Sequence, residues 1–107
     1  MKIVALEREI KGITDEQLQP HLRAEAARVW ELYQTGVLRE IYFTQDTQCA
    51  VLVLECSNAA ARALLESLPL VRHGLIEFEM HPLVPYPGFS RLFENAAEDS
   101  AEQGNRI

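Results

Sequence analysis

The spacing of hydrophobic residues changes in a fixed order along the 107-residue chain, and this order constrains the fold more than any other feature. Stretches with the two-residue period of a strand alternate with stretches that have the period of an amphipathic helix. The predicted order is strand, helix, strand, strand, helix, strand. The predicted strands are 1–8, 37–45, 48–56 and 75–83, and the predicted helices are 20–35 and 59–68.

Residues that start and stop helices support these boundaries. Pro20 suits the first turn of the longer helix, and Gly36 is typical of the position just after a helix end. Ser57 or Asn58 is expected to cap the second helix, because short polar side chains accept hydrogen bonds from its first turn. Pro69 is expected to end that helix.

Right-handed crossovers turn this order into the ferredoxin-like α+β fold, a four-stranded antiparallel sheet with both helices on one face. The almost continuously apolar strand over 48–56 is expected in the middle of the sheet, buried on both faces. Two helices leave the other face exposed, and a large apolar patch on a small protein marks an interface. We therefore expect a homodimer or a multiple of dimers. One domain over 1–94 and a polar, mobile tail over 95–107 are expected.

Charge and hydropathy restrict the partners and the environment. The chain carries 10 Lys and Arg against 16 Asp and Glu, and its scattered positive residues form no patch for a phosphate backbone. We expect neither nucleic acid nor a membrane as a partner, and the longest apolar run, 50–54, is far below the roughly 18 residues of a spanning helix. Cys49 and Cys56 lie too far apart on one strand to form a disulfide, and free thiols favour a cytoplasmic location.

A set of short motifs over 22–87 is similar to that of one known family. The motifs are Leu68-Pro69-Leu70, the strand Glu77-Phe78-Glu79-Met80-His81-Pro82-Leu83, the pair Tyr86-Pro87, and Gly36 followed by Arg39. In combination they resemble the muconolactone isomerase family. The resemblance implies a ferredoxin-like subunit, a dimeric α+β barrel, and an enzyme with no metal and no organic cofactor.

The resemblance also implies a chemistry. A muconolactone isomerase moves a proton next to a lactone carbonyl, which needs an acid/base group and a group that stabilises an enolate. The helix glutamate of the family corresponds to Glu25 and its strand arginine to Arg39. Histidine or tryptophan positions of the family are occupied by Glu40, Tyr42 and Tyr86, and these differences predict a divergent member with another substrate.

The candidate catalytic residues are Glu25, Glu40 and Tyr42. Glu40 and Tyr42 lie two residues apart and so share one face of their strand. Burial in an apolar barrel is expected to raise the pKa of the catalytic glutamate. The alternative for Glu25 is a solvated helix flank, where a pair with His21 contributes a few tenths of a kcal/mol.

The candidate substrate-binding residues are Arg39, His21 and Tyr86. Arg39 can bind a carboxylate through two hydrogen bonds, and His21 lies one helical turn before Glu25. In the alternative interpretation, Arg39 and Glu40 only protect an edge strand against aggregation.

The last strand raises the question of a metal. Glu77, Glu79 and His81 share one face, which fits either metal ligands or the solvated face of an antiparallel sheet. Because no other recognisable ligand set accompanies them, no metal site is predicted. The sequence also lacks the motifs of nucleotide-binding loops, zinc peptidases and serine hydrolases.

Three functions fit these observations. The first is a cofactor-free enzyme that isomerises a small anionic lactone or carbonyl compound by proton transfer. The second is a non-catalytic ligand-binding or assembly module that keeps the same dimeric barrel. The third is a cofactor-independent monooxygenase. Because one fold hosts all three, the site must decide between them.

Overall fold

The computed structural model describes residues 1–93, and the predicted tail over 95–107 lies outside the described residues. The strands form one antiparallel sheet in the order β2-β3-β1-β4, which is the ferredoxin-like α+β arrangement predicted from the sequence. The strands are β1 (Lys2–Glu9), β2 (Leu38–Phe43), β3 (Ala50–Glu55) and β4 (Ile76–Pro82). The helical elements are α1 (Asp15–Leu18), η1 (Gln19–His21), α2 (Leu22–Gln34), α3 (Asn58–Glu66), α4 (Pro69–Arg72) and η2 (Gly88–Leu92).

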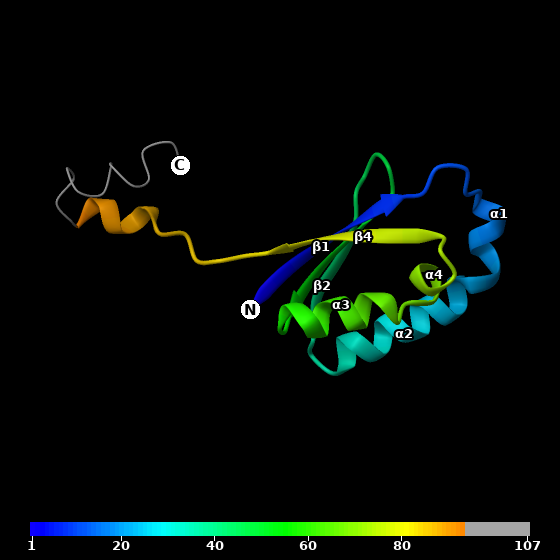
Figure 1. The fold of residues 1–107 in the computed structure, drawn as a ribbon, viewed down its shortest axis with the longest axis horizontal. Coiled ribbons are helices and arrows are strands. Elements are labelled where there is room, and N and C mark those ends of the chain that lie inside the picture. The colour runs from blue at the N-terminus through cyan, green and yellow to red at the C-terminus, as the bar shows by residue number, and fades with distance from the viewer. Residues whose placement is uncertain (94–107) are drawn as a thin grey trace.

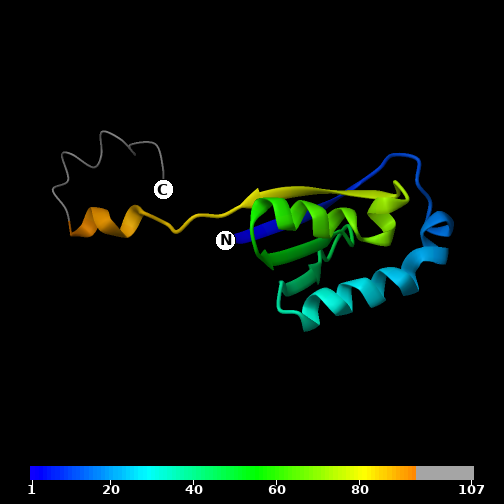
Figure 2. The same cartoon turned by 60° about the horizontal axis from the view of Figure 1, so that its bottom comes forward.

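The core lies between the sheet and the two longer helices. Figures 1 and 2 show α2 and α3 on the same face of the sheet. On that face Ile3 pairs with Leu54 and Ala5 pairs with Leu52, and all four side chains are buried. Each fully buried leucine or isoleucine side chain contributes about 1.5–3 kcal/mol. The two inner strands therefore provide the centre of the core.

The helix ends follow the local chemistry of the sequence. Gly36 has a φ of 84°, a left-handed conformation that glycine adopts without steric cost, and it follows the end of α2 as predicted. The Ser57 hydroxyl accepts the Ala60 N–H at 3.1 Å and caps α3. One boundary differs: the helix predicted over 59–68 ends at Glu66, and Pro69 then starts α4. Proline suits a first helical position because its fixed φ is helical and its missing N–H needs no partner there.

The face of the sheet away from the helices is called the open face here. Val4, Leu6, Val51 and Val53 of the two inner strands lie on it and are partly exposed. The central position of β3 is confirmed, but in the single chain it is fully covered on its helix side only. The open face is thus an apolar surface without a cover from residues 1–93.

The chain leaves the sheet after β4. Figures 1 and 2 show this segment extending away from the sheet to η2, and residues 83–93 are called the arm here. The arm is rich in exposed apolar side chains, and Val84, Leu92 and Phe93 are 78%, 76% and 84% exposed. It forms a second apolar surface that residues 1–93 leave uncovered.

Two further findings concern the environment of the chain. Cys49 and Cys56 are free thiols, as predicted from their spacing. Within residues 1–93, the helices are too short or too polar to span a bilayer.

Candidate functional site

A cavity of about 280 Å³ lies between α2 and the sheet. This volume is close to the lower end of the ~300–1,000 Å³ range of small-molecule sites. Most of its wall is apolar and comes from α2, β2, β3, α4 and β4, with Leu22, Val29, Phe43, Leu52, Leu70 and Phe78 among the lining residues. Among the described residues, the charged side chains that line the cavity are Glu25 and Glu7.

Glu25 enters the cavity from the first turn of α2 and is half-buried. Its Oε1 accepts the backbone N–H of Leu70, at the start of α4, at 2.9 Å. Burial raises the pKa of the Glu25 carboxyl, the Leu70 hydrogen bond opposes this rise, and the negative charge of Glu7 adds to it. A carboxyl group with a raised pKa in an apolar cavity is suited to general acid/base chemistry.

Glu7 enters the cavity from β1 and was not among the residues predicted from the sequence. Its Oε1 accepts the backbone N–H of Ala50 at 2.8 Å, next to the last β1–β3 pair, Leu6 with Val51. The signal was present in the alternation of β1, where residue 7 follows Ile3 and Ala5 on the buried face. A carboxylate at the next inward-facing position is an exception to the apolar pattern.

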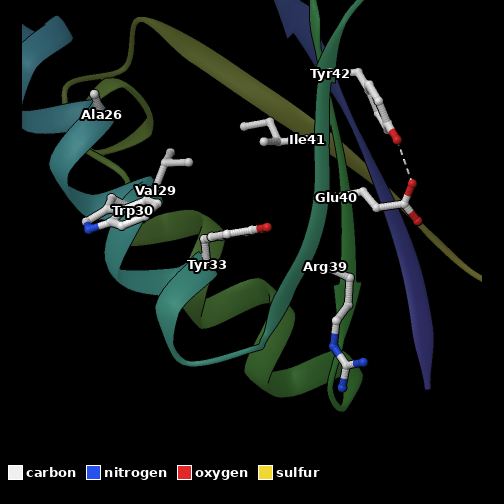
Figure 3. Close-up of a pocket in the computed structure, with 8 residues that line it drawn as sticks. All are labelled: Ala26, Val29, Trp30, Tyr33, Arg39, Glu40, Ile41 and Tyr42. Carbon is white, nitrogen blue, oxygen red and sulfur yellow. Dashed lines mark hydrogen bonds between the residues drawn. The ribbon is translucent and has the colours of Figure 1, made fainter.

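The predicted pair Glu40 and Tyr42 lies elsewhere. In the β2–β3 register these residues face Val53 and Val51, on the open face, whereas Ile41 between them lines the cavity. Figure 3 shows Glu40 and Tyr42 pointing away from α2, with the Tyr42 hydroxyl donating to Glu40 Oε1 at 2.7 Å. This bond and the charge of Glu40 raise the pKa of Tyr42. The structure thus separates Glu25 from Glu40 and Tyr42 by the thickness of the sheet.

Arg39 lies outside the cavity because of an irregularity in β2. The pairing jumps from Leu38–Leu54 to Glu40–Val53, so Arg39 occupies a β-bulge and is exposed. Its Nε donates to the Gly36 carbonyl at 2.6 Å. With Glu40 and Tyr42, Arg39 instead lines a second pocket of about 510 Å³ between α2 and β2, and Figure 3 shows its guanidinium directed away from Ile41. The strict alternation assumed for Arg39 and Glu40 is broken at this point.

The other two predicted substrate-binding residues also lie apart from the cavity. His21 precedes α2 and stacks on His73, with 4.2 Å between ring centroids, and it is not among the cavity-lining residues. Tyr86 belongs to the arm, where its ring lies 5.0 Å from that of Phe89 in an edge-to-face geometry and covers the backbone of Gly88. Of the predicted residues, only Glu25 lines the cavity.

The acidic face of β4 makes polar contacts on the sheet surface. Glu79 forms an ion pair with Arg8 of β1 and lies 2.6 Å from His81 Nε2, which is the arrangement of a solvated sheet face. Within the part of the chain that the structure describes, no three His, Cys, Asp or Glu side chains are grouped as a metal site would require.

Comparisons with known proteins place the fold. No protein-family model and no curated protein sequence matches the chain. Among solved structures, the chain is similar to the 5-chloro-2-hydroxyhydroquinone dehydrochlorinase TftG of Burkholderia phenoliruptrix, in complex with 2,5-dihydroxybenzoquinone. The TM-score is 0.59 at 16% sequence identity, over 82% of this chain and 98% of that chain. At this identity the likeness shows a common α+β fold.

Proposed function

We propose that the chain is a small-molecule enzyme that moves a proton on a carbonyl compound, with Glu25 as the acid/base group and the cavity as the substrate site. One observation carries the proposal: a half-buried carboxyl group with a raised pKa faces an apolar cavity. The fold neighbour, named as a dehydrochlorinase and bound to a small quinone, supports a small-molecule substrate. The resemblance to muconolactone isomerases supports Glu25 as the base.

The proposed step is an isomerisation in which atoms and charge balance. The Glu25 carboxylate accepts a proton from a carbon next to the carbonyl, and the electrons of the broken C–H bond form an enolate. The protonated Glu25 then returns the proton to another carbon of the enolate system. Apolar walls favour the first transfer, because they make the carboxylate more basic than it is in water. No electron is transferred, so the proposal retains the prediction of a cofactor-free enzyme.

The expectation of an anionic substrate rested on Arg39, which lies outside the cavity in the single chain. We therefore propose a carbonyl compound as the substrate and do not require it to carry a negative charge.

The alternative is a purely structural role, in which Glu25 only connects α2 to the start of α4 through its hydrogen bond with Leu70. Glu25→Gln separates the two roles, because the amide oxygen can still accept the Leu70 N–H while the side chain no longer exchanges a proton. The matched control is Glu40→Gln, the same substitution on the open face.

The test follows deuterium incorporation from D₂O into a panel of small cyclic ketones and unsaturated lactones by NMR. We expect the wild type and Glu40→Gln to accelerate exchange, and Glu25→Gln to lose about 10²–10⁴-fold in rate. Exchange that survives in Glu25→Gln would reject Glu25 as the base. Binding of these compounds without any exchange would instead favour the non-catalytic binding module.

We also propose that the enzyme is a homodimer built on the open face. The partly exposed Val4, Val51 and Val53 form an apolar centre, and the arm adds further apolar surface. A second copy would cover both.

A further inference from the structure

Glu7 is the charged side chain that the proposed proton transfer does not use. It projects from β1 toward α2, beyond the buried Ile3 and Ala5 on the same strand face. The Ala50 N–H, at 2.8 Å from Oε1, fixes the carboxylate against β3. Its position in the cavity wall is therefore set by the backbone of the sheet.

Glu25 occupies the wall opposite Glu7, on the helix side. One oxygen of each carboxylate is held by a backbone N–H, from Ala50 for Glu7 and from Leu70 for Glu25. No Lys, Arg or His of the described residues lines the cavity, so no positive side chain offsets these two groups there. The rest of the wall is apolar, and charges interact more strongly in such surroundings than in water.

We propose that Glu7 determines the charge selectivity of the cavity, which takes small, largely apolar ligands that are neutral or cationic and excludes carboxylates. The inference rests on the proposed function in that the cavity is taken as the substrate site. A ligand hydroxyl or ammonium group can donate to Glu7, while its ring packs on the apolar walls at Leu22, Val29 and Phe78.

An anionic ligand meets the opposite situation. Its carboxylate would lose hydration in an apolar cavity and would face Glu7 without a compensating cation. Like charges in this arrangement disfavour binding, and removal of one of them should restore at least about tenfold in affinity. Both carboxyl groups line the same apolar cavity, and the charge of Glu7 adds to the raised pKa of Glu25.

The test uses benzyl alcohol, benzylamine and benzoate, three ring compounds of similar size and different charge, with the full chain at neutral pH. Binding is measured by NMR titration for the wild type and Glu7→Gln, whose amide oxygen can still accept the Ala50 N–H. The control is Glu9→Gln on the same strand, which removes the same charge from a residue outside the cavity. We expect the wild type to bind benzyl alcohol or benzylamine at least tenfold more tightly than benzoate. Glu7→Gln should bind benzoate about tenfold more tightly than the wild type does. Glu9→Gln should bind benzoate with the affinity of the wild type.

Equal binding of benzoate and benzyl alcohol to the wild type would overturn the inference, and so would a Glu7→Gln protein with unchanged selectivity. A wild type that binds none of the three compounds would also overturn it. A second readout is the carboxyl titration of Glu25 by NMR, which should shift to lower pH in Glu7→Gln and stay in place in Glu9→Gln. If Glu7→Gln does not fold, the comparison of the three ligands on the wild type still decides.

The two proposals can fail separately. Loss of deuterium exchange in Glu25→Gln with unaltered ligand selectivity in Glu7→Gln would reject the role of Glu7 alone. Altered selectivity in Glu7→Gln with full exchange activity in Glu25→Gln would reject Glu25 as the base and leave the role of Glu7 in place.

Discussion

Ionisation of Glu25 lowers the free energy of unfolding, so the stability of the chain depends on pH through this residue. Its pKa is higher in the folded chain than in the unfolded chain, so between these two values the native state binds more protons. The stability that comes from the protonated form is therefore complete below the unfolded pKa and is lost as the pH rises through the folded pKa. Above the folded pKa, the ionised carboxylate destabilises its own cavity, as acid/base groups in active sites often do.

The first prediction concerns this dependence. Glu25→Gln should be more stable than the wild type at neutral pH and should show a smaller decrease in stability above about pH 4, since its amide does not ionise. Urea unfolding at a series of pH values measures both effects. Glu31→Gln, on the exposed side of the same helix, should instead lose a little stability with its 3.0 Å pair to Arg28. A less stable Glu25→Gln at neutral pH would show that the hydrogen bond of the charged carboxylate to Leu70, which an amide oxygen makes more weakly, outweighs the cost of burial.

The second prediction concerns Tyr42 on the open face. Its hydroxyl donates to a carboxylate, and both this bond and the charge of Glu40 favour the protonated phenol, so its pKa lies above the ordinary value for tyrosine. Glu40→Gln should move this transition to lower pH. Phenolate absorbance during a pH titration measures it, and Tyr42→Phe identifies which of the three tyrosine transitions is involved. An unchanged transition in Glu40→Gln would contradict the pairing.

Single residues show where sequence reasoning is weakest. Glu25 was located through a family resemblance, and the strand periodicity correctly placed Glu40 and Tyr42 on one face. Periodicity does not say which face meets the helices, and it fails at a bulge such as that of Arg39. Glu7 was missed because a charged residue near a strand end usually marks the end of burial, whereas here it continues the buried face.

At the scale of elements, the prediction from sequence was close because local signals agreed with one another. The order of strands and long helices along the chain was predicted from the sequence, and Gly36 and Ser57 mark helix boundaries where expected. The short α4 was not predicted, because proline both ends a preceding helix and opens a new one. Its backbone matters for the site, since the Leu70 N–H in α4 holds Glu25.

The third prediction tests the start of α3. Ser57→Ala removes the acceptor of the Ala60 N–H and should destabilise the fold by about 1 kcal/mol, while Ser57→Thr should restore most of the loss. Thermal or urea unfolding measures the difference. Ser67→Ala is not a neutral control, because the Ser67 hydroxyl accepts from Arg28 Nε at 3.0 Å and donates to the Leu64 carbonyl. If Ser57→Thr lost as much stability as Ser57→Ala, the capping role of Ser57 would be contradicted.

At the level of the whole molecule, residues 1–93 leave two apolar surfaces uncovered. The helices cover one face of the sheet, and the open face keeps Val4, Leu6, Val51 and Val53 partly exposed. The arm carries more apolar surface away from the sheet, with Phe89 69% exposed. Burial of this surface between two copies would stabilise the assembly by about 25 cal/mol for each Å² of apolar area removed from water. The Glu40–Tyr42 pair would then lie within the interface, whereas Glu25 and Glu7 would stay on the helix side of each sheet.

The last prediction tests this assembly with one substitution at the centre of the open face. Val53 lies between Val4 of β1 and Glu40 of β2, and its side chain is partly exposed, so an arginine there can extend into solvent in a single chain. In a dimer, the guanidinium group of each copy would be buried in an apolar interface. An unpaired charge there is unfavourable and would weaken association. Light scattering should therefore give about 24 kDa, twice 12.1 kDa, or a multiple of it for the wild type, and about 12 kDa for Val53→Arg. Ala63→Arg, the same charge on an exposed position of α3, should keep the mass of the wild type. A wild type that is monomeric at micromolar concentration, or a Val53→Arg protein that keeps the full mass, would show that the open face does not join two copies.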